Sequence, residues 1–360
     1  MKRDQTNKIV KKEITMKHIF VITLFIVLFV SFCATSLHAD TLPLTSSTSN
    51  ELPLSTIPTE ENEKTVDENI EEKASTVYMT SNISSDALMA IYEALGATPS
   101  GNIAVKLHTG ESENSNYLRS ELITELVQSL NGTIVECNTA YGGRRASAAY
   151  HLQLAEDHGF TAIADVDIMD GEGDISIPVT GGVHLEENFV GMTFPNYDYF
   201  VVLSHFKGHQ MGGFGGAIKN LAIGLASSRG KSWIHSAGTR TRGVSMGTNQ
   251  DDFLESMAEA AKSIFDYKDG NILYINVMNR LSVDCDCNAN PAEPDMHDIG
   301  ILASFDPVAL DQACVDLIYA AEDGQSVVNR IESRNGIHTL EHAEAIGLGS
   351  RTYELVSIDN

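Results

Sequence analysis

The stretch "SHFKGHQMGGFGGAIKN", residues 204–220, gathers side chains that can bind a metal or move a proton directly before a glycine-rich turn. On an extended strand, side chains two residues apart share a face, so His205, Lys207 and His209 would point the same way. Imidazoles ligate metals and exchange protons near neutral pH, and a desolvated lysine can act as a nucleophile. The stretch therefore predicts a reactive site, with His209, Lys219 and Lys207 as its catalytic residues.

The glycines of this stretch predict a place where backbone and ligand come close together. Glycine lacks a Cβ, and the N–H groups of such a turn, with the start of the following helix, suit an anion. The Lys-Ser/Thr pair of a phosphate-binding Walker loop is absent. The alternative is a tight strand-to-helix turn with solvated histidines. On the first interpretation, the cofactor-binding residues are Gly212, Gly213, Gly215, Gly216 and Lys219.

Two other segments supply groups for recognising an anionic substrate. The segment "TAYGGRRAS" contains Tyr141 and the pair Arg144 and Arg145, and "IAVKLHTGE" contains His108 near the end of a predicted strand. Guanidinium groups bind carboxylates and phosphates through paired hydrogen bonds. We therefore interpret these four residues as substrate-binding, with a solvated loop as the alternative for the two arginines.

Metal ligands are the third class of candidate. His235 lies sixteen residues after Lys219, and "SVDCDC" places Cys285 and Cys287 directly after a predicted strand. Together with His205 and His209 they form the predicted metal-binding set. For the two cysteines the sequence leaves four alternatives open: a metal site, a disulfide with Cys137 or Cys314, free thiols, or a redox-active pair.

Short apolar runs alternate with amphipathic segments after residue 77, which predicts an α/β fold with a mainly parallel, doubly wound sheet and flanking helices, in one lobe or in two with the site between them. The predicted strands are 103–108, 133–140, 161–169, 199–206, 271–281, 299–304 and 352–358. The predicted helices are 84–95, 118–130, 146–158, 216–227, 251–265, 306–322 and 338–347. Ligand sites in such sheets lie beyond the carboxyl ends of the strands, where the reactive stretch falls.

The N-terminal region predicts export. Six basic residues precede an apolar run of about sixteen residues from Ile19 to Ala34, which is shorter than the ~20 residues of a membrane span. We interpret residues 1–39 as a signal peptide or N-terminal anchor, and residues 40–76, rich in Ser, Thr, Pro and Glu, as a disordered acidic spacer. The α/β domain would then occupy residues 77–360, outside the cytoplasm, and the N-terminal segment would be its one contact with a membrane.

Charge excludes one class of partner. The chain has 360 residues, 42% of them hydrophobic, with a formal net charge of −25. A surface this acidic repels nucleic acid. The cation-rich stretch is therefore expected to serve a small-molecule ligand.

Taken in order, the motifs "VKLHTGE", "TAYGGRRAS", "LSHFKGH", "GGFGGAIKNLAIG", "GKSWIHS", "CDC" and "DIGILASFDPVALDQA" resemble the family known as domain of unknown function 362, often labelled uncharacterised iron-sulfur centre proteins. Many members insert a cysteine-rich, ferredoxin-like module after the "GKSWIHS" position. Here the interval "AGTRTRGVSMGTNQDD" contains no cysteine. The resemblance therefore implies the family scaffold, and an iron-sulfur cluster is not expected.

His209, the glycine turn, Lys219 and His235 also resemble, in order and spacing, part of the nickel-pincer lactate racemases. By that resemblance Lys219 would anchor a metal-bearing cofactor, His235 would be a metal ligand, and His209 would be an acid/base. The His-Arg-Pro segment of the racemases has no counterpart in this sequence, where "TAYGGRR" occupies the comparable place. The resemblance thus implies a metal-dependent enzyme of redox or isomerase type. The alternative is a non-catalytic metal- or ligand-binding protein on the same scaffold.

Overall fold

The computed structural model describes residues 74–111 and 116–359. All of them belong to one compact unit, Asn69–Asn360. The predicted signal segment and nearly all of the predicted spacer lie outside the described residues, so export remains a prediction. Within the described ranges, none of the helices combines the length and apolar character needed to cross a membrane.

An eight-stranded sheet forms the centre of the unit, in the order β12-β1-β11-β10-β7-β2-β3-β4. All neighbouring pairs are parallel except those made by β11, which is antiparallel to both β10 and β1. This confirms the predicted mainly parallel α/β fold. The strands are β1 (Ser75–Thr80), β2 (Ile103–Lys106), β3 (Thr133–Glu136), β4 (Val166–Ile168), β7 (Tyr199–His205), β10 (Ile272–Met278), β11 (Gly300–Ser304) and β12 (Tyr353–Ser357).

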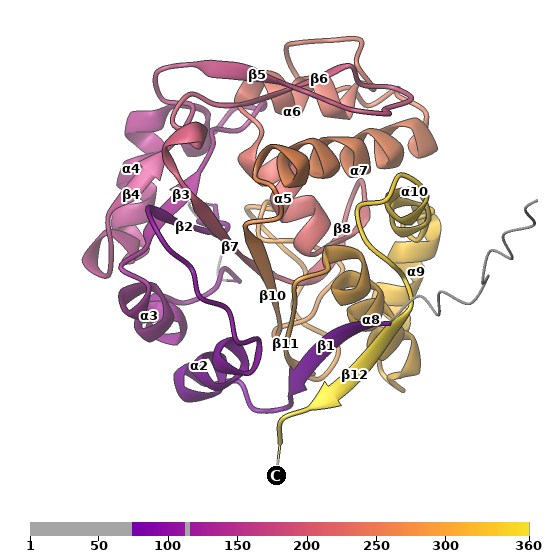
Figure 1. The fold of residues 1–360 in the computed structure, drawn as a ribbon. Coiled ribbons are helices and arrows are strands. Elements are labelled where there is room, and N and C mark those ends of the chain that lie inside the picture. Colours follow the sequence, from indigo (N-terminus) through magenta and orange to yellow (C-terminus); the bar gives the residue numbers. More distant parts are fainter. Residues whose placement is uncertain (1–73, 112–115, 360) are drawn as a thin grey trace, which may run out of the picture. The chain divides into compact units, whose positions relative to one another are not determined.

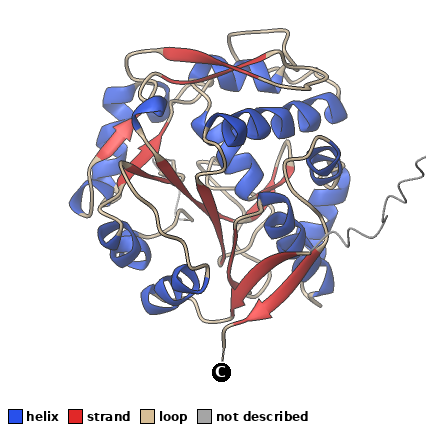
Figure 2. Ribbon diagram, viewed as in Figure 1, coloured by secondary structure: helices blue, strands red, loops and turns tan. Residues whose placement is uncertain are grey.

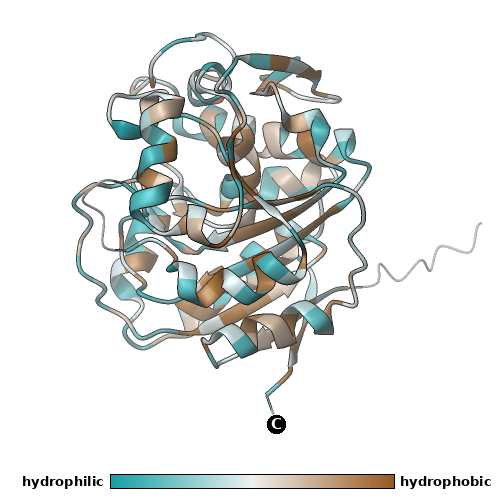
Figure 3. Cartoon of the chain, turned by 90° about the vertical axis from the view of Figure 1, so that its left-hand side faces the viewer, coloured by the Kyte–Doolittle hydropathy of each residue, from teal (hydrophilic) through white to brown (hydrophobic). Residues whose placement is uncertain are grey.

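Helices cover both faces of the sheet, which is why its central strands are apolar at nearly every position. Along β7, Phe200 and Val202 face one core, while Val201 and Leu203 face the other. Figure 2 shows the helices on either side of the strands, and Figure 3 shows hydrophobic residues concentrated in the interior. The two cores fix the face to which each side chain points, because a slip of one residue would exchange the faces.

The helices divide between these faces. Figure 1 shows α2, α3 and α4 on one side and α5, α7 and α8 on the other. Their bounds are α2 (Ser85–Ala94), α3 (Ser120–Ser129), α4 (Ala148–Asp157), α5 (Ala217–Leu225), α6 (Ser228–His235), α7 (Gln250–Tyr267), α8 (Pro307–Ala320), α9 (Gln325–Ser333) and α10 (His338–Ala345). Short 3-10 turns occupy Arg144–Ala146, Phe160–Ala162 and Phe194–Asn196.

Several elements differ from the sequence prediction. The first strand in the described residues, β1, begins at Ser75, slightly before the predicted start of the domain, and the hairpin of β5 (Asp174–Pro178) and β6 (Glu187–Gly191) was not predicted. The reactive stretch also divides, because β7 ends at His205. A new short strand, β8 (Lys207–His209), pairs antiparallel with β9 (Gly213–Gly215).

Candidate functional site

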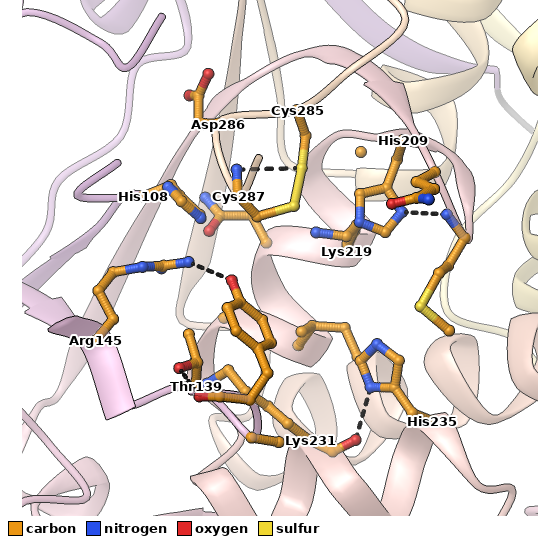
Figure 4. A pocket seen from close by; sticks show the side chains of 18 of the residues that line it. His108, Thr139, Arg145, His209, Lys219, Lys231, His235, Cys285, Asp286 and Cys287 are labelled. Carbon is orange, nitrogen blue, oxygen red and sulfur yellow. Dashed lines mark hydrogen bonds between the residues drawn. A yellow bond between two sulfur atoms is a disulfide. The ribbon is translucent and has the colours of Figure 1, made fainter. Parts of the chain in front are cut away.

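A cavity of about 350 Å³ opens at the carboxyl ends of β2, β3, β7 and β10. Its walls come from the segments that follow those strands and from α5 and α6. This is the edge at which open parallel sheets bind ligands. Figure 4 shows the side chains that face the cavity, including Lys219, His209, His235 and the cysteine pair.

His209 presents an N–H group to the cavity. Its Nδ1 accepts hydrogen bonds from the backbone N–H groups of Met211 and Gly212, at 3.2 and 2.9 Å. Burial, and then the charge of Lys219, lower the pKa of His209 well below its usual value, so the ring is neutral. A neutral imidazole with Nδ1 as acceptor has its proton on Nε2. His209 is therefore a hydrogen-bond donor toward the cavity.

His108 has the same local geometry on a different strand end. The backbone N–H of Gly110 donates to its Nδ1 at 3.0 Å, and Gly110 has a φ of +83°, which favours glycine. Burial and the nearby Arg145 lower the pKa of His108 well below its usual value. His108 is thus a second neutral ring whose Nε2 carries the proton.

His235, at the end of α6, has the opposite tautomer. Its Nδ1–H donates to the backbone carbonyl of Lys231 at 2.7 Å, and its ring stacks on Phe253 with centroids 4.9 Å apart. Burial lowers its pKa to about 4. Its Nε2 consequently has a free lone pair and, within the described part of the chain, no hydrogen-bond partner. Of His108, His209 and His235, this one is set up to bind a metal or take a proton.

Lys219 lies on α5 and lines the cavity without forming a hydrogen bond or an ion pair to any described residue. Burial, followed by the charges of Arg145 and Lys106, lowers its pKa to about 8. Gly215 gives it room, since a Cβ there would lie 3.2 Å from Cδ of Lys219. The amine is therefore directed toward a ligand and has an increased neutral fraction, as a nucleophile needs.

The start of α5 is fixed from a distant part of the chain. Asp311 on α8 accepts hydrogen bonds from the N–H groups of Ala217 and Ile218, at 2.8 and 3.0 Å. Gly216 allows this approach, because a Cβ there would come within 2.2 Å of Oδ1 of Asp311. The anion at this helix start is thus the protein's own carboxylate, where the sequence predicted a ligand.

The four glycines predicted to bind a cofactor have different positions and roles. Gly215 and Gly216 line the cavity. Gly212 supplies the N–H that fixes the His209 ring. Gly213 has a φ of +81° and packs against Gly336, so it allows a close backbone approach within the protein.

Arg145 is held by protein carboxylates. Its guanidinium donates to Oε1 of Glu111, at 2.6 Å from the closer nitrogen, and lies 3.4 Å from Oε1 of Glu136. Tyr141 joins the network, donating to Glu111 at 3.0 Å. Arg145 and Tyr141 line the cavity, whereas Arg144 pairs with Asp157 on the surface and lies outside it. The structure therefore differs from the prediction for Arg144.

Glu136 and Lys106 complete this network and were not among the predicted site residues. The Lys106 ammonium lies 3.3 Å from Glu136, and it also donates to Oδ1 of Asn220 at 2.9 Å. Burial alone would raise the pKa of Glu136, but Lys106 and Arg145 lower it to about 2. A signal existed in the sequence, because each is a charged residue at the end of an otherwise apolar strand.

Two predicted site residues have structural partners. His205 is bonded at both ring nitrogens, Nδ1 to Asp286 at 2.8 Å and Nε2 to the carbonyl of Asn279 at 2.9 Å, so neither is open to a metal. Lys207 is fully buried and donates to the carbonyls of Asn279 and Arg280, outside the cavity lining. His205 therefore lines the cavity with both ring nitrogens occupied, whereas Lys207 does not reach it.

Cys285 and Cys287 form a disulfide with each other on the cavity wall. Neither Cys137 nor Cys314 takes part, because both are buried free thiols. A ring nitrogen of His209 lies within 4.8 Å of both sulfurs, the one group of three such ligand atoms found among the described residues. Of the alternatives left open by the sequence, the structure places the pair as a short disulfide beside an imidazole N–H.

The fold and site define an α/β protein with a ligand cavity rich in hydrogen-bond donors at the carboxyl edge of its sheet. Residues 103–316 match the model of a family described as a domain of unknown function (DUF362), and the chain belongs to that family. A comparison with curated protein sequences finds no match.

Two solved structures show weak similarity. The lactate racemase apoprotein from Thermoanaerobacterium thermosaccharolyticum aligns with 79% of this chain and 83% of its own, at 13% identity and a TM-score of 0.40. A protein from Thermotoga maritima aligns with 74% of this chain and 60% of its own, at 10% identity and a TM-score of 0.37. Neither similarity is strong enough to transfer a function.

Proposed function

We propose that this protein is an enzyme that binds a small anionic substrate, together with a metal or metal-bearing cofactor, in the cavity at the carboxyl edge of the sheet. The observation that carries the proposal is the arrangement of its neutral histidines. His108 and His209 present N–H donors, while His235 presents a lone pair. A site with donors for an anion and a separate ligand for a metal combines the two requirements of such an enzyme.

The lysines of the cavity favour a negatively charged substrate. Glu136 and Glu111 neutralise Lys106 and Arg145, but Lys219 has no carboxylate partner among the described residues. Lys231 likewise donates to backbone carbonyls, at 2.6 Å to Ala226. A carboxylate-bearing substrate would satisfy this excess of positive charge. Donors placed in advance around a developing oxyanion are a large source of rate enhancement.

The residues present fit a metal-bearing cofactor. Lys219 would anchor it and His235 would ligate its metal, since the amine and Nε2 both lack protein partners in the described residues. When bound, such a group would supply a Lewis acid or an electron sink. His209 and His108 would orient the substrate through their N–H groups, and Gly215 would leave space beside Lys219.

The first test is elemental analysis and intact-protein mass spectrometry on protein isolated from its native host. We expect a stoichiometric metal and an extra mass on the peptide that contains Lys219. Lys219→Met should lose both, whereas Lys262→Met, at a lysine paired with Asp266 outside the cavity, should retain them. A folded wild-type protein with neither metal nor adduct would overturn the cofactor role.

The alternative, a non-catalytic binding protein, gives a different outcome in the same experiment. It predicts a metal that exchanges with chelator and an unmodified Lys219 peptide. Independently, the histidine tautomers can be read from ¹⁵N chemical shifts. We expect the proton on Nε2 in His108 and His209 and on Nδ1 in His235, and a reversed His209 would remove its role as a donor.

A further inference from the structure

We infer that Cys285 and Cys287 form a redox-active disulfide that exchanges with a small, carboxylate-bearing thiol bound in the cavity. The bond lines the cavity, so a small molecule can reach it. Figure 4 shows the two cysteines, Lys219 and His209 around the same space. The carboxylate preference rests on the proposed anion site, whereas the reducibility of the disulfide does not.

The surroundings of the sulfurs stabilise the reduced state. The backbone N–H of Cys287 donates to Sγ of Cys285 at 3.3 Å, and a ring nitrogen of His209 lies within 4.8 Å of both sulfurs. Because Nδ1 of His209 is occupied by backbone N–H groups, its Nε2–H faces the cavity as a donor. Thiolates gain from such donors and from nearby positive charge, and a better-stabilised leaving thiolate accelerates exchange.

The same geometry argues against a preformed metal site at these three residues. A metal on Nε2 of His209 would have to displace the proton that the backbone hydrogen bonds at Nδ1 keep there. A disulfide beside an imidazole N–H needs no such change. The chain's other described cysteines, Cys137 and Cys314, contrast with this pair, because burial raises the pKa of each thiol and removes it from solvent.

The reaction balances with two equivalents of thiol. The thiolate RS⁻ attacks Sγ of Cys287, the S–S bond breaks, and its electron pair leaves on Sγ of Cys285, which takes a proton from water. A second RS⁻ attacks the sulfur of the bound RS group, releasing RSSR, and Sγ of Cys287 leaves as a thiolate that is protonated in turn. The disulfide is reduced to two thiols while two RSH are oxidised to RSSR.

The test compares mercaptoacetate with neutral 2-mercaptoethanol on the purified full-length chain, with Lys219 shown to be unmodified by intact-protein mass spectrometry. Opening of the disulfide is followed by differential alkylation and mass analysis of the peptide that contains both cysteines. Each rate is divided by the rate for the same protein unfolded in urea, which removes the difference in intrinsic thiol reactivity. We expect the normalised rate for mercaptoacetate to saturate with concentration and to exceed that for 2-mercaptoethanol about 10-fold or more, as for one well-placed ion pair.

Variants separate the two parts of the inference. Lys219→Met should reduce the preference for mercaptoacetate to about threefold or less, while Lys262→Met should retain it. Equal normalised rates for the two thiols, a disulfide that neither thiol opens in the folded protein, or cysteines already reduced and metal-bound on isolation would each overturn the inference. A Lys219 adduct found together with an unreactive disulfide would remove this inference and leave the proposed function standing.

Discussion

Three cavity histidines and His338, which lies outside the cavity, have opposite pKa shifts. In the cavity, burial lowers the pKa values of His108, His209 and His235, and the rings are neutral. Where α7 meets α10, His338 instead lies 2.7 Å from Glu255, and although partial burial opposes it, the hydrogen bond to that carboxylate raises its pKa. Burial without a carboxylate keeps the cavity rings neutral, so that they can bind a metal or a substrate. A carboxylate partner favours the charged form of His338, which forms an ion pair.

The largest expected effect is on the metal content, and it tests the role of the cavity histidines. His235→Gln removes the free Nε2 lone pair, so the metal content of protein isolated from the native host should fall about 10-fold or more. His338→Gln, outside the cavity, should leave the metal content unchanged. Elemental analysis of both variants checks this, and equal metal loss in the two would show that His235 is no more important for the metal than His338.

The next effect is on stability at acidic pH. The unfolded chain protonates His235 near pH 6.5, whereas the folded chain does so only near a pKa of about 4. Below pH 6.5 the unfolded state therefore binds more protons, and the free energy of unfolding falls as the pH is lowered. Between pH 6.5 and pH 5 this one ring should account for ~2 kcal/mol.

Urea unfolding at pH 7.5 and pH 5 measures this contribution. His235→Gln cannot titrate, so its loss of stability between the two pH values should be smaller than that of the wild-type protein by a similar amount. Identical pH dependence in the two proteins would mean that folding does not lower the pKa of His235, contrary to its buried surroundings.

The smallest effect belongs to the ion pair of His338 and Glu255. Because the pKa of His338 is raised on folding, its contribution is complete below about pH 6.5 and is lost as the pH rises through the folded value. The pKa of Glu255 is lowered despite partial burial, so the contribution is also lost as the pH falls through that folded value, below about 4.5. Both side chains are partly exposed, so we expect about 0.5–1 kcal/mol.

His338→Gln should therefore lower the free energy of unfolding near pH 5.5 and have little effect at pH 9. The comparison of urea midpoints at the two pH values isolates the ion pair from the general effect of the substitution. A loss of the same size at both pH values would show that His338 contributes through packing alone.

The fold was predictable from the sequence because its signals are local. Apolar runs such as 199–206 and 271–281 contain the observed strands β7 and β10, and each predicted helix overlaps an observed one. The hairpin of β5 and β6 was missed because its strands are short and carry polar residues such as Asp174 and Glu187 at their ends.

The site was predictable only in part, because side-chain direction depends on contacts that the sequence does not contain. Alternation predicted a shared face for His205, Lys207 and His209, but β7 ends at His205 and a separate short strand, β8, begins at Lys207. Adjacent arginines could not be distinguished either. Arg145 turns inward only because Glu111 and Glu136 meet it from two other segments.

The contact between Asp311 and the start of α5 has a consequence for biosynthesis. The hydrogen bonds that fix the first turn of the lysine-bearing helix span 94 and 93 residues of sequence. During translation, the stretch that contains Lys219 leaves the ribosome well before the residue that holds it in place. The cavity therefore reaches its final form only after α8 has been made, and a nascent chain that ends before α8 lacks the carboxylate that holds the start of the lysine-bearing helix.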